Sequence, residues 1–156
     1  MAASFAVPDL AEVSGLTVDG AGRLRVDEFL RALAAPRVVA AGDAMAAPPA
    51  VGWHLRMGCA SALPLGAHAA GTVLAALRGR RPARLSVGYL VQCISLGRRR
   101  GFVQVVRSDD SPRSVHLGGR LAATVKESVC AMVLEAPRKE RTRPGSYAAP
   151  KGPRAA

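Results

Sequence analysis

The sequence has few aromatic residues: they make up 4% of its 156 residues, although the apolar share is 49%. A core without large rings is built from alanine, valine and leucine, so each buried residue contributes less apolar area. Only three cysteines are present, Cys59, Cys93 and Cys130, and none of them forms a C-x-x-C pair. This spacing excludes a zinc-finger pattern and an even disulfide framework, and we expect free thiols in a reducing compartment.

The G-x-G-x-x-G motif is also absent. That motif forms the glycine-rich turn that holds a dinucleotide pyrophosphate at a helix N-terminus. Gly15, Gly20 and Gly22 lack its spacing. No Ser–His–Asp set and no carboxylate pair indicates acid–base catalysis, and we expect His68 to be a core residue. The sequence therefore predicts no pyrophosphate site and no catalytic residue within this chain.

Charged residues are missing from positions 57–77. This run is long enough to span a bilayer. It also contains Pro64, His68 and several glycines and alanines, which make a poor membrane helix. We therefore predict a helix buried inside the protein at about 60–78, with Pro64 in its first turn and Gly79 as its C-cap.

A short apolar run, Val38-Val39-Ala40-Ala41, lies upstream of this helix and is followed by Gly42 and Asp43. Its β-branched and small residues predict a buried strand at about 38–41. Gly42 would let the backbone approach a ligand closely, because glycine has no Cβ. Asp43 would then lie outside the carboxyl end of the strand, where open α/β sheets bind their ligands.

The order of strand, Gly-Asp, proline-containing loop and small-residue helix resembles the second flavin-binding motif of the FAD-dependent pyridine nucleotide–disulphide oxidoreductases. Within that superfamily it is most similar to the type II NADH dehydrogenase-like proteins. The resemblance implies that Asp43 accepts a hydrogen bond from a ribityl hydroxyl of FAD and that Gly42 allows the close approach. It also implies that the helix N-terminus points at the flavin ring. The residues expected at that helix entry are Met57, Gly58, Cys59 and Ala60.

The second half of the chain predicts a small antiparallel unit. Strands are expected at 86–95 and 102–107, around the arginine-rich turn 97–101, with a third strand at 115–117. Apolar residues at helical spacing predict a helix at 119–134. The stretch from Leu85 to Val105 resembles the hairpin that opens the C-terminal interface domain of the same family.

The predicted fold class is α/β for the intact protein and α+β for this piece. Residues 1–79 are expected to form the C-terminal segment of a Rossmann-like FAD-binding domain. Residues 80–136 would form the interface domain, and 137–156 a disordered basic tail. Within the first segment, an Asp-Gly signal predicts a hairpin at 17–26, and a short helical turn is expected at 29–33.

The charge is unevenly distributed. Residues 1–77 carry five basic and six acidic side chains, whereas 78–156 carry 17 basic and five acidic ones. A basic half attracts phosphate, anionic lipid or an acidic partner. This leaves an alternative function open, a basic module that binds nucleic acid or a membrane surface without catalysis. Nucleic acid is the less favoured partner, because few aromatic residues accompany the arginines.

The resemblance implies an oxidoreductase that passes electrons from NAD(P)H through FAD to a quinone-like acceptor. We expect this chain to be inactive alone, because the N-terminal FAD and NAD fingerprints are missing from it. A complementing N-terminal half would supply them. No secretory signal is evident, so the expected location is the cytoplasm, with peripheral contact to the membrane and a homodimer as further possibilities.

Overall fold

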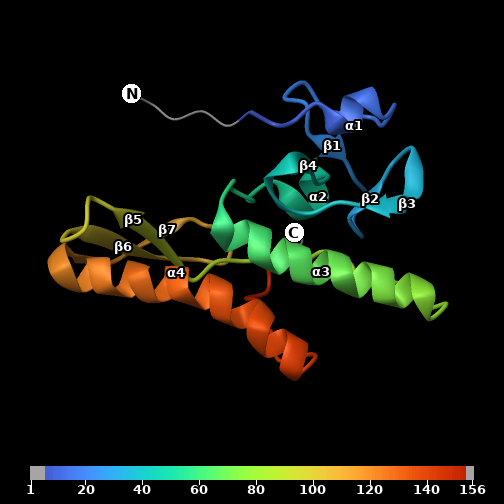
Figure 1. Ribbon diagram of the computed structural model, residues 1–156. Coiled ribbons are helices and arrows are strands. Elements are labelled where there is room, and N and C mark those ends of the chain that lie inside the picture. Colours follow the sequence, from blue (N-terminus) through green and yellow to red (C-terminus); the bar gives the residue numbers. More distant parts are fainter. Residues whose placement is uncertain (1–5, 154–156) are drawn as a thin grey trace. The chain divides into compact units, whose positions relative to one another are not determined.

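The computed structural model describes residues 6–153, which form two compact units, 6–85 and 86–153. Helices and strands occur in both, so the chain is α+β (Figure 1). The units are described separately below.

The first unit contains one long helix and several very short elements. The elements are α1 (Leu10–Val13), β1 (Leu24–Arg25), β2 (Arg31–Ala32), β3 (Ala35–Val39), the 3-10 turn η1 (Gly42–Ala44), β4 (Met45–Ala46), α2 (Pro49–Gly52) and α3 (Cys59–Leu77). Strands β1 and β4 pair in parallel, and β2 and β3 pair antiparallel. Leu24, Val26, Leu30, Ala32 and Met45 are buried between these elements.

Two successive turns in this unit, headed by Asp19 and Asp27, are built in the same way eight residues apart. In each turn, Oδ1 of the aspartate accepts hydrogen bonds from the backbone N–H groups two and four residues later. The arginine four residues on, Arg23 or Arg31, donates from Nε to Oδ2 at 2.8 Å. Such local bonding by aspartate favours turns over helix.

The first of these turns closes the hairpin predicted at 17–26, where Val18 bridges Leu24 antiparallel. The second replaces the helical turn expected at 29–33, and that prediction was wrong. Leu30 takes a positive φ of 67° in the second turn and is fully buried. The chain then continues into β2, because the backbone N–H groups of Phe29 and Arg31 are bound by Asp27.

The predicted strand at 38–41 corresponds to β3, but it is not buried. Val38 is 39% exposed, and the strand pairs with β2 alone. A two-stranded sheet covers one face of its strands at most, so apolar composition did not guarantee burial here. Among residues 6–153, the parallel pairing is that of β1 with β4, two residues long.

Helix α3 matches the predicted helix in extent, but the expectation that it is buried was wrong. Leu74 is 48% and Leu77 is 79% exposed. Its buried positions are Ser61, Pro64, Leu65 and Thr72. By length and composition α3 is apolar enough to cross a membrane, a property that core helices of soluble proteins share.

Thr72 bears on the packing of α3 within the first unit, and Pro64 on the hydrogen bonds of the helix itself. Thr72 Oγ1 donates to the carbonyl oxygen of Phe29 at 2.8 Å and so ties the helix to the second aspartate turn. Pro64 lies five residues after the first residue of the helix, beyond the first turn where it was expected. A proline there removes one intrahelical hydrogen bond.

The second unit is a three-stranded antiparallel sheet with one helix, as predicted. The strands β5 (Val91–Ser95), β6 (Gly101–Val106) and β7 (Pro112–Gly118) pair in the order β5-β6-β7, and α4 (Gly119–Thr142) follows. Helix α4 crosses β6 closely at Gly101: an added Cβ there would lie 2.8 Å from the backbone nitrogen of Ala123. Val103 and Ala122 are buried at this crossing.

Helix α4 extends eight residues past the predicted end at 134 and contains Pro137. Figure 1 shows the helix changing direction in its C-terminal half, as expected where a proline interrupts the hydrogen-bond ladder. Of the tail that was predicted to be disordered, residues 137–142 belong to α4, so that part of the prediction was wrong. Gly88 N–H donates to the carbonyl oxygen of Pro150, and Gly152 N–H to Ser86 Oγ.

Candidate functional site

A hydrogen bond joins the Gly-Asp motif to the entry of the long helix. Oδ1 of Asp43, in η1, accepts from the backbone N–H of Gly58 at 3.0 Å, fifteen residues along the chain. Gly58 is the N-cap residue of α3. The carboxylate of Asp43 therefore lies at the N-terminal end of the long helix.

A cleft of about 310 Å³ lies beside this bond. Gly42, Asp43 and Met57 line it, together with residues from both ends of the intervening loop. The volume is at the low end of the range for small-molecule sites. It suits part of a dinucleotide rather than all of it.

The first turn of α3 gives this end of the cleft a positive field. Gly58 has a φ of 137°, and its carbonyl oxygen accepts from the N–H groups of Ser61 and Ala62 at 3.0 and 2.9 Å. A helix N-terminus carries about half a positive charge from its unpaired N–H groups. This field stabilises the carboxylate of Asp43, which accepts the hydrogen bond from Gly58 N–H at the helix N-terminus.

Gly42 is needed for its backbone conformation more than for free space. Its φ is 75°, which L-residues with a side chain rarely adopt. An added Cβ would lie 3.9 Å from the Cβ of Ala62, an ordinary contact. The glycine therefore lets the chain turn sharply so that the next residue, Asp43, faces α3.

Cys59 and Ala60 lie outside the cleft, whereas Met57 lines it and Gly58 is bound to Asp43. Both are exposed on the first turn of α3, and neither lines the cleft. Of the six predicted residues, the structure thus brings Gly42, Asp43, Met57 and Gly58 together. The side chain of Cys59 does not contribute to the cleft, although its backbone belongs to the helix N-terminus.

Sequence reasoning missed several residues of the cleft. Ser61 is 1% exposed, lines the cleft, and its hydroxyl donates to the carbonyl oxygen of Arg56. Trp53, which is 66% exposed, also lines it, and its ring meets His54 edge-on. Ser61 does not cap α3, whose N-cap residue is Gly58, and no sequence signal marked its place in the cleft. Nothing in the sequence marked Trp53.

His68 lies in the middle of α3 and is half-buried, not a fully buried core residue. Burial lowers the pKa of its imidazole, and a hydrogen bond with the backbone of Ala83 opposes that shift. The ring is therefore mostly neutral at pH 7. It does not line the cleft.

The carboxylate of Asp43 offers the cleft one further hydrogen-bond acceptor. One oxygen of Asp43 is bound to Gly58, and in the described part of the chain no hydrogen-bond donor reaches Oδ2. A ribityl hydroxyl is the kind of donor that this oxygen can accept. Among residues 6–153, no cluster of three or more histidine, cysteine or carboxylate side chains could hold a metal ion.

No protein-family model matches the chain, and no curated protein matches it. The likeness to the type II NADH dehydrogenase-like proteins stays a prediction, based on the order of short motifs described above.

Proposed function

We propose that this chain is the C-terminal portion of a flavoprotein oxidoreductase that passes electrons from NAD(P)H through FAD to a quinone-like acceptor. Residues up to 79 would complete a Rossmann-like FAD-binding domain, and the sheet and helix of the second unit would be its interface domain. The observation that supports this most is the bond from Gly58 N–H to Asp43 Oδ1. It places a carboxylate, a positive-φ glycine and a helix N-terminus around one cleft.

In this proposal the residues of the chain bind and orient the cofactor. Asp43 would accept the ribityl hydroxyl through Oδ2 while Oδ1 keeps Gly58 in place. The N-terminus of α3 would stabilise negative charge on the pyrimidine side of the ring. Bound FAD would supply the redox chemistry, and the protein supplies position and electrostatics.

The pyrophosphate end of FAD would be held elsewhere. The glycine-rich fingerprint for it does not occur in the 156 residues. We therefore propose that the chain works together with a segment or partner chain that carries this fingerprint and the one for NAD(P)H.

The test replaces Asp43 by asparagine in the protein complemented with a glycine-rich N-terminal half. Asparagine keeps an oxygen for Gly58 N–H but puts an amide donor where Oδ2 was. We expect FAD retention after gel filtration to fall by about tenfold, which corresponds to the loss of one hydrogen bond to a charged group. Asp9→Asn is the matched control, because it removes one charge from a side chain that makes no capping bond. Equal retention in the two variants would refute the assignment of Asp43.

A further inference from the structure

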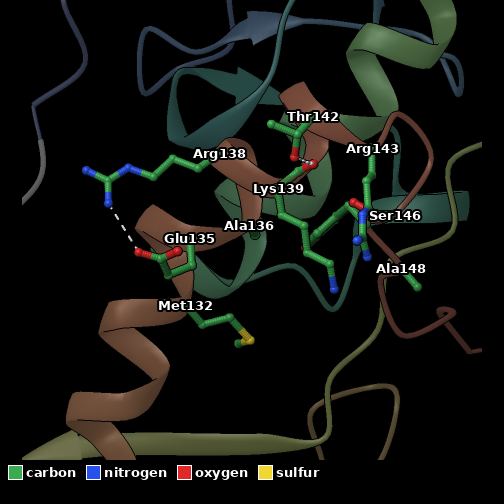
Figure 2. A pocket seen from close by; sticks show the side chains of 10 residues that line it. Met132, Glu135, Ala136, Arg138, Lys139, Thr142, Arg143, Ser146 and Ala148 are labelled. Atoms are coloured by element: carbon green, nitrogen blue, oxygen red, sulfur yellow. Dashed lines mark hydrogen bonds and ion pairs between the residues drawn. The ribbon is translucent and has the colours of Figure 1, made fainter.

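A cleft in the second unit lies between the C-terminal half of α4 and the chain that follows it. Its volume is about 720 Å³, and the residues that line it all lie between Met132 and Ala148 (Figure 2). Its residues from 137 on belong to the segment that the sequence predicted to be a disordered tail. The proposed flavin site does not use it.

The returning chain on one side of this cleft is held by Glu140. Its carboxylate accepts hydrogen bonds from the N–H groups of Gly145 and Tyr147 and from the hydroxyl of Ser146. These bonds, that of Gly145 first, lower the pKa of Glu140, so the carboxylate stays ionised at pH 7. The carboxylate of Glu140 therefore holds residues 145–147 in place as one wall of the cleft.

The cleft has more positive than negative charge. Arg138, Lys139 and Arg143 line it, with Glu135 as the one carboxylate among the lining residues. Glu135 is paired with Arg138 at 3.1 Å, as the dashed line in Figure 2 shows. Lys139 and Arg143 have no carboxylate within ion-pair distance in the described part of the chain.

Lys139 and Arg143 lie one helical turn apart, and Figure 2 shows their side chains extending in the same direction. Two cations on one side of a cleft repel each other unless an anion lies between them. The whole second unit adds to this field, since residues 86–153 carry twelve basic and five acidic side chains. An arginine beside a lysine is well suited to phosphate, because the guanidinium offers two parallel donors and the ammonium a point charge.

The rest of the cleft wall is suited to an organic group. Met132, Ala136 and Ala148 give apolar surface, and the half-buried ring of Tyr147 gives an aromatic one. Methionine makes favourable contacts with aromatic rings and adapts to their shape. A bare phosphate would leave most of the 720 Å³ unfilled, whereas a nucleoside monophosphate would use both parts.

We propose that the cleft formed by α4 and residues 143–148 binds a phosphate ester with an apolar or aromatic substituent, its phosphate held by Lys139 and Arg143. This chemistry occurs in free nucleotides and in the headgroups of anionic lipids. The proposal does not depend on the flavin site, which lies in the other unit.

The experiment measures binding to the full chain by isothermal titration calorimetry with adenosine monophosphate and with inorganic phosphate. Co-sedimentation with vesicles of phosphatidic acid and phosphatidylcholine tests the lipid source. The variant is the double substitution Lys139→Gln and Arg143→Gln. The matched control is Arg98→Gln with Arg99→Gln, which removes the same charge from the exposed turn between β5 and β6. Circular dichroism checks that both variants are folded.

We expect saturable binding of the nucleotide, at least about tenfold tighter than that of inorganic phosphate. The cleft variant should lose at least about tenfold in affinity, because two charge-assisted contacts are removed. The control should lose less than about threefold, the part that comes from the long-range field. If vesicles bind and the nucleotide does not, with the same dependence on Lys139 and Arg143, the phosphate comes from lipid. Equal losses in the two double variants, or no saturable binding of any probe, would overturn the proposal.

Discussion

Gly22 and Leu30 occupy the same position in the two aspartate-headed turns, three residues after Asp19 and Asp27. Their φ angles are +75° and +67°. Glycine takes this conformation without steric cost, whereas a residue with a Cβ is strained by about 1–2 kcal/mol. Leucine is tolerated at position 30 because its side chain is fully buried and offsets that cost.

The first turn therefore predicts different responses to substitution at its two glycines, Gly20 and Gly22. Gly22→Ala should lower the free energy of unfolding by about 1 kcal/mol, because alanine must adopt the positive φ. Gly20→Ala is the matched control, since its φ is not in that range and nothing lies within 4 Å of an added Cβ. Urea denaturation measures both. If the two variants were equally stable, the turn geometry would be wrong.

The aspartate of the second turn predicts how stability depends on pH. Burial raises the pKa of Asp27, but hydrogen bonds from the backbone and side chain of Arg31 and from Phe29 N–H outweigh it, and the pKa is lowered overall. A lowered pKa in the folded state means that Asp27 stabilises the fold above its unfolded pKa of about 3.9. This contribution is lost as the pH falls through the folded pKa.

Asp27→Asn should therefore reduce the stability at pH 7 and make the decline below pH 4 shallower than in the wild type. Urea midpoints between pH 2.5 and pH 7 measure this. A variant whose acid decline parallels that of the wild type would show that Asp27 is not linked to folding.

At the scale of elements, α4 crosses β6 in close backbone contact at Gly101. An added Cβ at Gly101 would lie 2.8–3.0 Å from three backbone atoms of Ala122 and Ala123. Backbone cannot move aside as a flexible side chain can, so Gly101→Ala should cost about 1–3 kcal/mol. Gly118→Ala, with open space around it, is the control. Thermal unfolding followed by circular dichroism should show a lower midpoint for the Gly101 variant alone.

The sequence predicted those elements that depend on local pattern. The small, uncharged residues of α3 and the alternation in β5 and β6 were sufficient for their type, although β5 begins at Val91 and not at 86 as predicted. The sequence did not predict burial, because the exposed face of α3 depends on what packs against it. The end of α4 was missed because Pro137 indicates a helix stop, whereas here the helix continues past it to Thr142.

The candidate site was predictable to a similar degree. The Gly-Asp motif and the helix entry lie fifteen residues apart, and the structure joins them through Asp43 and Gly58. Ser61 and Trp53 reach the same cleft through the fold of the intervening loop, which no sequence period describes. The cleft of the second unit depends on hydrogen bonds from Gly145 and Tyr147 to Glu140, which hold the following chain against α4. The composition of this segment, basic with proline and glycine, gave no sign of these contacts.

At the scale of the whole molecule, the arginines at 98–100 form an exposed turn between β5 and β6. Their charge predicts weak, non-specific binding of nucleic acid that falls steeply as salt rises. When the protein is titrated with a labelled DNA duplex, its affinity should fall as the salt concentration rises and be lost at about physiological salt. A sequence-selective complex that persists at 200 mM salt, which is in the range where such binding weakens, would favour the nucleic-acid function instead.

The proposal of a half-site for FAD is tested most directly by the visible absorbance of flavin on the purified protein. The chain alone should be colourless after gel filtration, because under the proposal it would provide only the ribityl and ring end of the site, without the pyrophosphate turn. Addition of an N-terminal half with the glycine-rich fingerprints should give a yellow protein that oxidises NADH, and that half alone should hold FAD more weakly. Stoichiometric FAD on the isolated chain would contradict the account, as would equal FAD retention by the N-terminal half without it.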